Sequence, residues 1–154
     1  MRAQMSDTQS ILLVEDNQDD YEATCRAFEK ASLRNPIVWC KSGRDALACL
    51  KQEGAYKDAS NGSRPGLVLL DLNMPGMDGR KTLEAIKQDH SLKQVPVIIL
   101  TTSADERDIQ TCYQTGANTY VQKPVSFDGL IEAIKRLKAY WFEIALLPKE
   151  TDHG

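Results

Sequence analysis

The sequence predicts an α/β domain in which helices cover both faces of a parallel β-sheet. Four short segments are almost continuously apolar, as is typical of strands buried on both faces, and a fifth strand-like segment follows them. These segments span residues 11–14, 37–40, 67–70, 96–100 and 119–122. The stretches between them carry apolar residues at the three- and four-residue spacing of helices. This alternation predicts parallel pairing, because each crossover helix returns the chain to the same end of the sheet.

The five expected helices lie between and after these strands. The first spans residues 18–31, the second starts at Ser42 or Gly43, and the third starts at Asp78–Gly79. The fourth spans residues 105–115 and ends at Gly116, which we expect to be its C-cap, and the fifth spans residues 126–145. The inner positions that we expect are Tyr21, Cys25 and Phe28, then Ala46, Leu47 and Leu50, then Leu83 and Ile86, and then Ile109, Cys112 and Tyr113. Crossovers between parallel strands are right-handed, which favours the flavodoxin-like strand order 2-1-3-4-5.

Length and composition indicate one ordinary globular domain. The chain has 154 residues, of which 42% are hydrophobic. Its net charge of −3 argues against a nucleic-acid or anionic-membrane partner, and no apolar run approaches the length of a membrane span. The four cysteines show no CxxC pairing, so we expect free thiols in a cytoplasmic protein. We expect a flexible N-terminal tail over residues 1–10, the domain over 11–148 and a tail over 149–154.

Polar residues follow four of the predicted strands. They are Glu15 and Asp16, Asp71, Thr101, and Lys123. In the expected strand order these strands are neighbours, so the polar groups meet at one edge of the sheet. Three carboxylates repel one another unless a cation lies between them, and oxygen ligands suit Mg²⁺. With a lysine and a hydroxyl beside them, these groups suit phosphoryl transfer to an aspartate carboxylate.

These motifs resemble those of the receiver domains of bacterial two-component response regulators. The matching residues are Glu15–Asp16, Asp71 with Met74–Pro75–Gly76, Thr101, and Lys123–Pro124. The likeness extends over nearly the whole chain, from about Ile11 to Ile144. It implies a phosphoacceptor without an enzymatic activity of its own beyond slow self-dephosphorylation.

The resemblance also implies a role for each site residue. Asp71 is the phosphoacceptor, and Lys123 pairs with the phosphoryl group. Asp16 and Asp71 bind Mg²⁺ together with the backbone carbonyl of Asn73, and Glu15 acts directly or through water. Thr101 moves to hydrogen-bond the phosphoryl group, and Tyr120 rotates inward in response. The Lys123–Pro124 bond is expected to be cis.

A narrower likeness is to the small stand-alone response regulators that partner bacterial phytochromes. It is carried by the long loop before residue 67, Thr101–Thr102–Ser103, residues 116–118 and the aromatic end of the last helix. It implies a sensor histidine kinase, a bacteriophytochrome, as partner. Thr102 departs from the small residue common at that position in receivers, which puts reaction rates in doubt. We expect no attached output domain, and therefore signalling through protein contacts.

Other interpretations remain open for the same residues. Glu15 and Asp16 could cap the first helix, and Lys123 could be a surface lysine. An aspartyl-phosphate phosphatase would need a second aspartate two residues after Asp71 as general acid, and Asn73 stands there. A flavodoxin-like carrier would need a hydroxyl- and glycine-rich phosphate loop in place of the acidic pair.

The last helix carries more apolar residues than one face needs. Phe127, Leu130, Ile134, Leu137, Trp141 and Ile144 form one stripe that the sheet can bury. Tyr140, Phe142, Leu146 and Leu147 lie beside this stripe. These extra residues could fold back on their own domain. We expect instead that they form a homodimer interface, because exposed apolar patches mark partner surfaces.

Overall fold

The computed structural model describes residues 9–56, 64–74 and 78–144. Within these ranges the strands are β1 (Ile11–Val14), β2 (Ile37–Cys40), β3 (Leu67–Leu70), β4 (Val97–Thr101) and β5 (Thr119–Gln122). The helices are α1 (Gln18–Lys30), α2 (Gly43–Lys51), α3 (Gly79–Gln88), α4 (Glu106–Thr115) and α5 (Phe127–Lys138), with a 3-10 turn η1 (Gly54–Tyr56) and a π-helical turn η2 (Ala139–Ile144). Among the described helices, none is long and apolar enough to cross a membrane.

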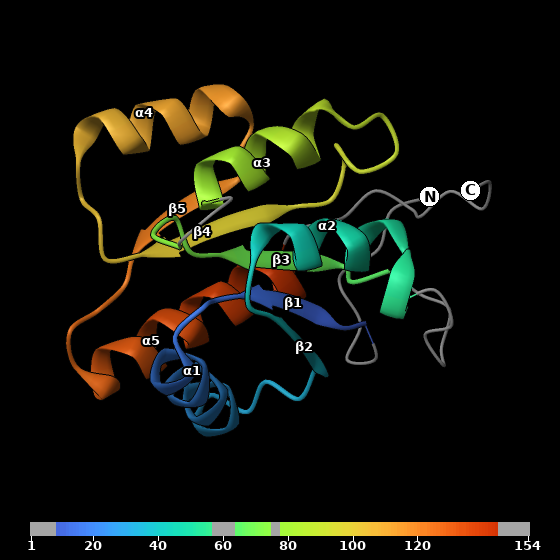
Figure 1. Cartoon of the computed structure of the whole chain (residues 1–154). Coiled ribbons are helices and arrows are strands. Elements are labelled where there is room, and N and C mark those ends of the chain that lie inside the picture. The colour runs from blue at the N-terminus through green and yellow to red at the C-terminus, as the bar shows by residue number, and fades with distance from the viewer. Residues whose placement is uncertain (1–8, 57–63, 75–77, 145–154) are drawn as a thin grey trace.

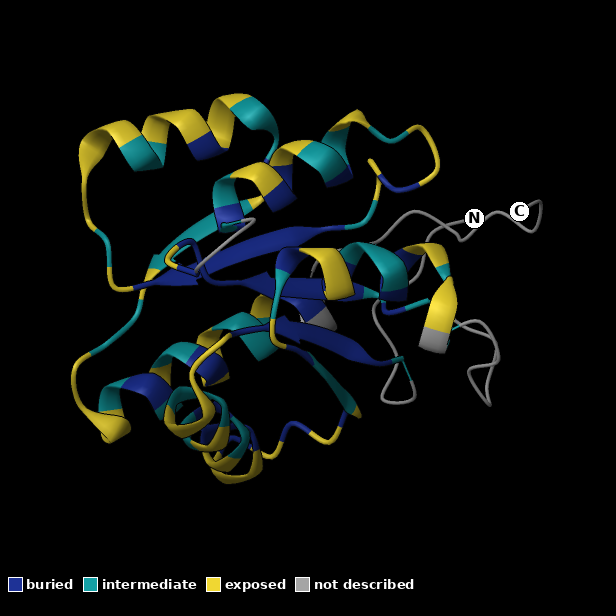
Figure 2. Ribbon diagram, viewed as in Figure 1, coloured by how far each residue is buried: buried dark blue, intermediate teal, exposed yellow. Residues whose placement is uncertain are grey.

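The five strands form one parallel sheet in the order β2-β1-β3-β4-β5, which confirms the predicted fold. Helices α1 and α5 lie together on one face of the sheet, and α2, α3 and α4 cover the other (Figure 1). All the strands therefore end at the same edge of the sheet. The central strands β1, β3 and β4 are buried along their whole length, as the dark blue ribbons show (Figure 2).

Successive residues of these strands point to opposite faces and supply two cores. Leu12, Val14, Val68 and Leu70 pack under α2 and α3. Ile11, Leu13, Leu67 and Leu69 pack under α1 and α5. Burying a side chain of this size contributes about 2 kcal/mol, which explains why both faces of each strand are apolar.

Each helix begins where a short polar side chain accepts a hydrogen bond from a backbone N–H of the first turn. These N-caps are Asn17, Ser42, Asp78, Asp105 and Ser126. They satisfy N–H groups that have no partner within the helix. Gly116 ends α4 with φ 123°, a conformation that favours glycine, as predicted for a C-cap.

Three features of the helices differ from the prediction. Tyr113 and Phe127, expected to face inward, are exposed. The inner positions that are only partly buried are Tyr21, Cys25, Leu47, Ile109 and Leu137. Helix α5 ends at Lys138, and the chain continues as the π-helical turn η2. Leu130, Ile134 and Trp141 are buried as expected. Residues 145–154, with Leu146, Leu147 and the predicted tail, lie outside the described residues, as do residues 1–8 and the side chains of Phe142 and Ile144.

Smaller predictions have mixed outcomes. The four cysteines are free. The described chain has no cis peptide bond, so the expected cis Lys123–Pro124 bond is wrong; trans is the preferred isomer even before proline. Ser10, which we assigned to the tail, is buried, and its carbonyl accepts the N–H of Gly66. Ser10 is therefore packed as part of the domain.

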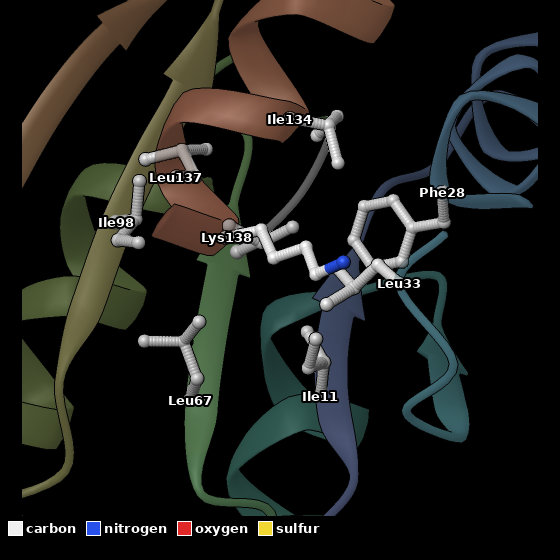
Figure 3. A pocket seen from close by; sticks show the side chains of 9 residues that line it. Ile11, Phe28, Leu33, Leu67, Ile98, Ile134, Leu137 and Lys138 are labelled. Atoms are coloured by element: carbon white, nitrogen blue, oxygen red, sulfur yellow. The ribbon is translucent and has the colours of Figure 1, made fainter. Parts of the chain in front are cut away.

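A small apolar pocket lies between the sheet and helices α1 and α5 (Figure 3). Its lining includes Ile11, Leu67, Ile98, Phe28 and Leu137. The aliphatic stem of Lys138 also lines it, while Lys138 Nζ lies 3.1 Å from the carbonyl oxygen of Ser32, just after α1. The lysine therefore joins the ends of α1 and α5 without burying its charge.

Candidate functional site

The polar residues at the strand ends gather at one edge of the sheet. Glu15 follows β1 and is 3% exposed, Asp71 follows β3 and is 8% exposed, and Asp16 faces solvent. One carboxylate oxygen from each of these three residues lies within 4.8 Å of the other two. Thr101, the last residue of β4, is fully buried beside them in the sheet order. The register of the parallel strands thus brings together residues that are up to 86 positions apart in sequence.

Lys123 enters this site from the end of β5. Its Nζ lies 2.9 Å from Glu15 Oε1 and 3.6 Å from Asp20 Oδ2, and its side chain is 11% exposed. Its backbone N–H donates to the carbonyl oxygen of Thr101 at 2.6 Å, which extends the pairing of β4 and β5 by one residue. The lysine is therefore anchored at both ends, with its ammonium group among carboxylates.

Burial changes the charge balance of the Glu15–Lys123 pair. The pKa of the Glu15 carboxyl is raised from 4.5 to about 7, chiefly by burial and also by the nearby charge of Asp71; the hydrogen bond and charge of Lys123 oppose this rise. Burial alone would lower the pKa of Lys123. The hydrogen bond to Glu15 and the nearby acids outweigh it and raise that pKa above its usual value. The site therefore has a firmly charged ammonium group beside a carboxyl group that titrates near neutral pH.

Asp71 and Thr101 are both linked to Asn73. The backbone N–H of Asn73 donates to Asp71 Oδ1 at 3.3 Å, and its side-chain amide lies 3.4 Å from Thr101 Oγ1. Asn73 itself is exposed. The loop after β3 thus orients one oxygen of Asp71 and contacts the hydroxyl on the neighbouring strand. Pro75 and Gly76 of the predicted motif lie outside the described residues.

Tyr120 on β5 is half-buried and bonded to the loop after β4. Its hydroxyl donates to the carbonyl oxygen of Ser103 at 2.9 Å. Ser103 Oγ donates to Asp108 Oδ2 at 2.8 Å, and Arg80 on α3 binds both oxygens of Asp108 at 2.8 and 2.7 Å. The loop that begins at Thr101 is therefore connected to β5, α4 and α3.

The carboxylate cluster has the ligand chemistry of a hard divalent cation. Its three members offer oxygen atoms within 4.8 Å of one another, and the exposed side of Asp16 leaves room for water ligands. Lys123 brings one positive charge to a group of three carboxyl groups. These residues therefore fit a divalent metal ion that keeps part of its water shell.

Comparison with known proteins places this geometry in a family. The family model of the response regulator receiver domain matches residues 11–135. The chain belongs to the response regulator receiver domains. Members of this family are typically phosphoacceptors, and the strand-end cluster described above lies inside the matched region.

Similar receiver proteins are stand-alone response regulators. Response regulator Rcp1 of Synechocystis sp. is 36% identical over 138 residues, which cover 90% of this chain and 92% of Rcp1. Its Mn²⁺-bound structure superposes with a TM-score of 0.81, at 35% identity, covering 92% of this chain and 99% of that one. The receiver protein described here thus matches Rcp1 along almost its full length.

Two further solved structures are similar. The phosphorylated cyanobacterial phytochrome response regulator RcpA has a TM-score of 0.84 and 39% identity, and the bacteriophytochrome response regulator AtBRR has 0.72 and 40%. Each match covers 92% of this chain and 99% of the other. The receiver is thus homologous to stand-alone regulators of the phytochrome type.

Three residues of this receiver site escaped the sequence analysis. Asp20 lies 3.6 Å from the ammonium of Lys123, Ser103 joins Tyr120 to Asp108, and Trp39 donates its indole N–H to the Glu15 carbonyl at 2.7 Å. Ser103 was noted only as part of the Thr101–Thr102–Ser103 likeness, without a role in the site. Trp39 had a visible signal of its own, because it is a side chain with a polar group on an otherwise apolar strand that leads to the same edge.

Proposed function

We propose that this receiver accepts a phosphoryl group from a histidine kinase on Asp71 and signals through protein contacts when phosphorylated. The position of Asp71 supports this most strongly. It is 8% exposed at the end of the buried central strand, with two further carboxylates close by. Thr101 ends the adjacent strand β4, and Lys123 follows β5, the next strand beyond β4, on the same edge.

In this proposal the Asp71 carboxylate is the nucleophile. One of its oxygens forms a bond to phosphorus while the bond between phosphorus and the kinase histidine nitrogen breaks. The backbone N–H of Asn73 donates to Asp71 Oδ1, so in this proposal the other carboxylate oxygen of Asp71 attacks phosphorus. The Lys123 ammonium and the Thr101 hydroxyl then stabilise the charge on the transferred group.

The same proposal assigns the acidic cluster to Mg²⁺. Asp16 and Asp71 would hold it with the backbone carbonyl of Asn73, and Glu15 would take part directly or through water. When bound, Mg²⁺ supplies positive charge to a site that a phosphate dianion could not otherwise approach. On phosphorylation, the Lys123 ammonium group would leave the Glu15 carboxylate and pair with a phosphoryl oxygen.

Thr101 and Tyr120 form the switch in this proposal. Thr101 would move toward the phosphoryl group and carry the following loop with it. Tyr120 donates to Ser103, two residues beyond Thr101, so this movement would break its bond and let the ring turn inward. The surface formed by α4, β5 and α5 would change in consequence.

In this proposal the protein is cytoplasmic, and its kinase partner is of the bacteriophytochrome type. RcpA is a phytochrome response regulator and AtBRR a bacteriophytochrome response regulator, and this chain matches each over most of its length. We also propose that the protein is no enzyme beyond slow self-dephosphorylation. A phosphatase of the aspartyl type would need a general acid where Asn73 stands, and an amide cannot donate a proton in that role.

We also propose a homodimer through the end of the last helix. Tyr140 is 51% exposed and rests edge-on against the buried Trp141, with ring centroids 5.2 Å apart. Phe142, Leu146 and Leu147 would extend this surface. Light scattering over a concentration series should show a dimer, and replacement of Phe142 and Leu147 by serine should give a folded monomer. A wild-type monomer with and without a phosphoryl analogue would contradict the proposal.

Phosphotransfer tests the assignment of Asp71. Incubation with acetyl phosphate or a phosphorylated phytochrome-type kinase should label the wild type in the presence of Mg²⁺. Asp71→Asn keeps the shape but removes the nucleophile, and it should take no label. Asp128→Asn, the same exchange at an exposed acid on α5, is the control and should label normally. Labelling of Asp71→Asn, or normal labelling of the wild type in excess chelator, would refute the assignment.

A further inference from the structure

Trp39 on the edge strand β2 reaches the backbone of the acidic loop. Its indole Nε1–H donates to the carbonyl oxygen of Glu15 at 2.7 Å, at the short end of the range for such bonds. The indole lies parallel to the ring of Tyr21 on α1, with centroids 3.9 Å apart and planes inclined by 4°. Lys41 Nζ lies 4.8 Å from the Trp39 ring centroid. The indole is therefore held in place by β2 and α1.

The carbonyl group that Trp39 binds belongs to the peptide unit between Glu15 and Asp16. A peptide unit is planar, so holding its oxygen fixes the orientation of the whole link between the two acids. The preceding peptide unit is held as well, because the N–H of Glu15 donates to the carbonyl oxygen of Cys40 at 3.0 Å. Strand β2 thus fixes both peptide units that flank the Glu15 Cα, one through its backbone and one through Trp39.

Apolar cover alone does not explain this arrangement, because a phenylalanine would stack on Tyr21 without an N–H group. The second tryptophan of the chain makes the contrast clear. Trp141 is 7% exposed, and its Nε1 has no hydrogen-bond partner among the described residues. One indole is used as a donor at the acidic loop, while the other only fills the core beside α5.

We propose that Trp39 is a positioning residue for the metal-binding carboxylates of this receiver. Its N–H holds the Glu15–Asp16 peptide unit so that both side chains face Asp71. The inference rests on the metal site in the proposed function. Removing the N–H should weaken divalent metal binding by about 10-fold, the lower end of the effect of losing a residue that orients a ligand, because the Glu15–Cys40 bond remains.

Metal affinity measured without phosphotransfer tests this role. Mn²⁺ suits the same oxygen ligands as Mg²⁺, and its free concentration can be followed by electron paramagnetic resonance. The wild type and Trp141→Phe should bind Mn²⁺ equally, and Trp39→Phe should bind about 10-fold more weakly. If Phe disturbs the stack on Tyr21, benzothienylalanine at position 39 keeps the bicyclic ring and removes only the donor. Urea unfolding of each metal-free variant checks the fold.

A spectroscopic measurement tests the same contact directly. Trp39 is the only tryptophan left in Trp141→Phe, so its emission should change as Mg²⁺ saturates the site. Trp141, left alone in Trp39→Phe, should show no such change. Equal Mn²⁺ affinity in Trp39→Phe and Trp141→Phe, or no metal response of Trp39 emission, overturns the inference while the metal site stands. A wild type that binds no Mn²⁺ refutes the metal site itself, and this inference falls with it.

Discussion

Glu15 is buried with a raised pKa, so the stability difference between Glu15→Gln and the wild type should depend on pH in the metal-free protein. The folded protein keeps the Glu15 proton up to about pH 7, whereas the unfolded chain releases it near 4.5. Between these values the folded state binds more protons, so the wild type loses stability as pH rises. Glu15→Gln cannot ionise and does not share this loss.

The pKa difference sets the size of the effect. At 1.36 kcal/mol for each pH step, the interval between 4.5 and about 7 corresponds to about 3 kcal/mol. Glu15 is 3% exposed, so solvent screening removes little of it. The free energy of unfolding of Glu15→Gln minus that of the wild type should therefore increase by about 2 to 3 kcal/mol from acid to neutral pH and stay constant above pH 8.

Urea unfolding followed by circular dichroism, at several values between about pH 4.5 and about pH 8, measures this difference. Glu53→Gln, the same exchange at an exposed position, is the control and should show no such trend. Saturating Mg²⁺ should compensate the ionised Glu15 and reduce the gain in Glu15→Gln. A stability difference that does not change with pH would refute the reasoning, because it would mean that Glu15 is ionised throughout and fully compensated by Lys123.

Three further predictions concern the framework of the site. Gly79→Ala should lower the free energy of unfolding by about 3 kcal/mol and slow phosphorylation, because the new Cβ would overlap the carbonyl oxygen of Asp71. Urea unfolding measures the first effect, and phosphoryl labelling measures the second. Arg80→Ala and Asp108→Ala should each cost about 1 kcal/mol, since this bidentate pair is partly exposed, and a double-mutant cycle should show that the two losses are not additive. Ile134→Ala should cost about 3 kcal/mol, because the side chain is fully buried between α5 and the sheet, and unchanged unfolding would contradict this packing.

The strands were the most predictable part of the fold. Four of the five have the expected bounds, and the fourth runs over Val97–Thr101, one residue later than expected. A parallel strand covered on both faces needs apolar residues without interruption, so its sequence marks both of its ends. Thr101 has a polar side chain, but it is part of β4 because its backbone pairs with Gln122 of β5. Backbone pairing of this kind leaves no trace in hydropathy.

The helix faces were less predictable. Spacing along a helix gives the direction of its apolar stripe, but the width that becomes buried depends on neighbouring elements. Tyr113 continues the stripe of α4 and is exposed, with its hydroxyl accepting the backbone N–H of Tyr120. Tyr21 lies at the margin of α1, where the edge strand supplies Trp39 as its partner. Neither contact is local in sequence.

The partner of Lys123 shows where sequence reasoning about the site ends. In the strand order, one strand separates β5 from the Asp71 strand and two separate it from the Glu15 strand, so proximity alone favours Asp71 as the ion-pair partner. The ammonium group instead lies 2.9 Å from Glu15. Each carboxylate accepts one backbone N–H at 3.3 Å, from Asn17 on Glu15 and from Asn73 on Asp71, so these bonds do not distinguish the two acids. Glu15 is the more deeply buried carboxyl, so it gains more from a cation. The four-carbon stem of lysine makes the longer reach possible, and relative burial, which only the folded structure defines, decides between the two acids.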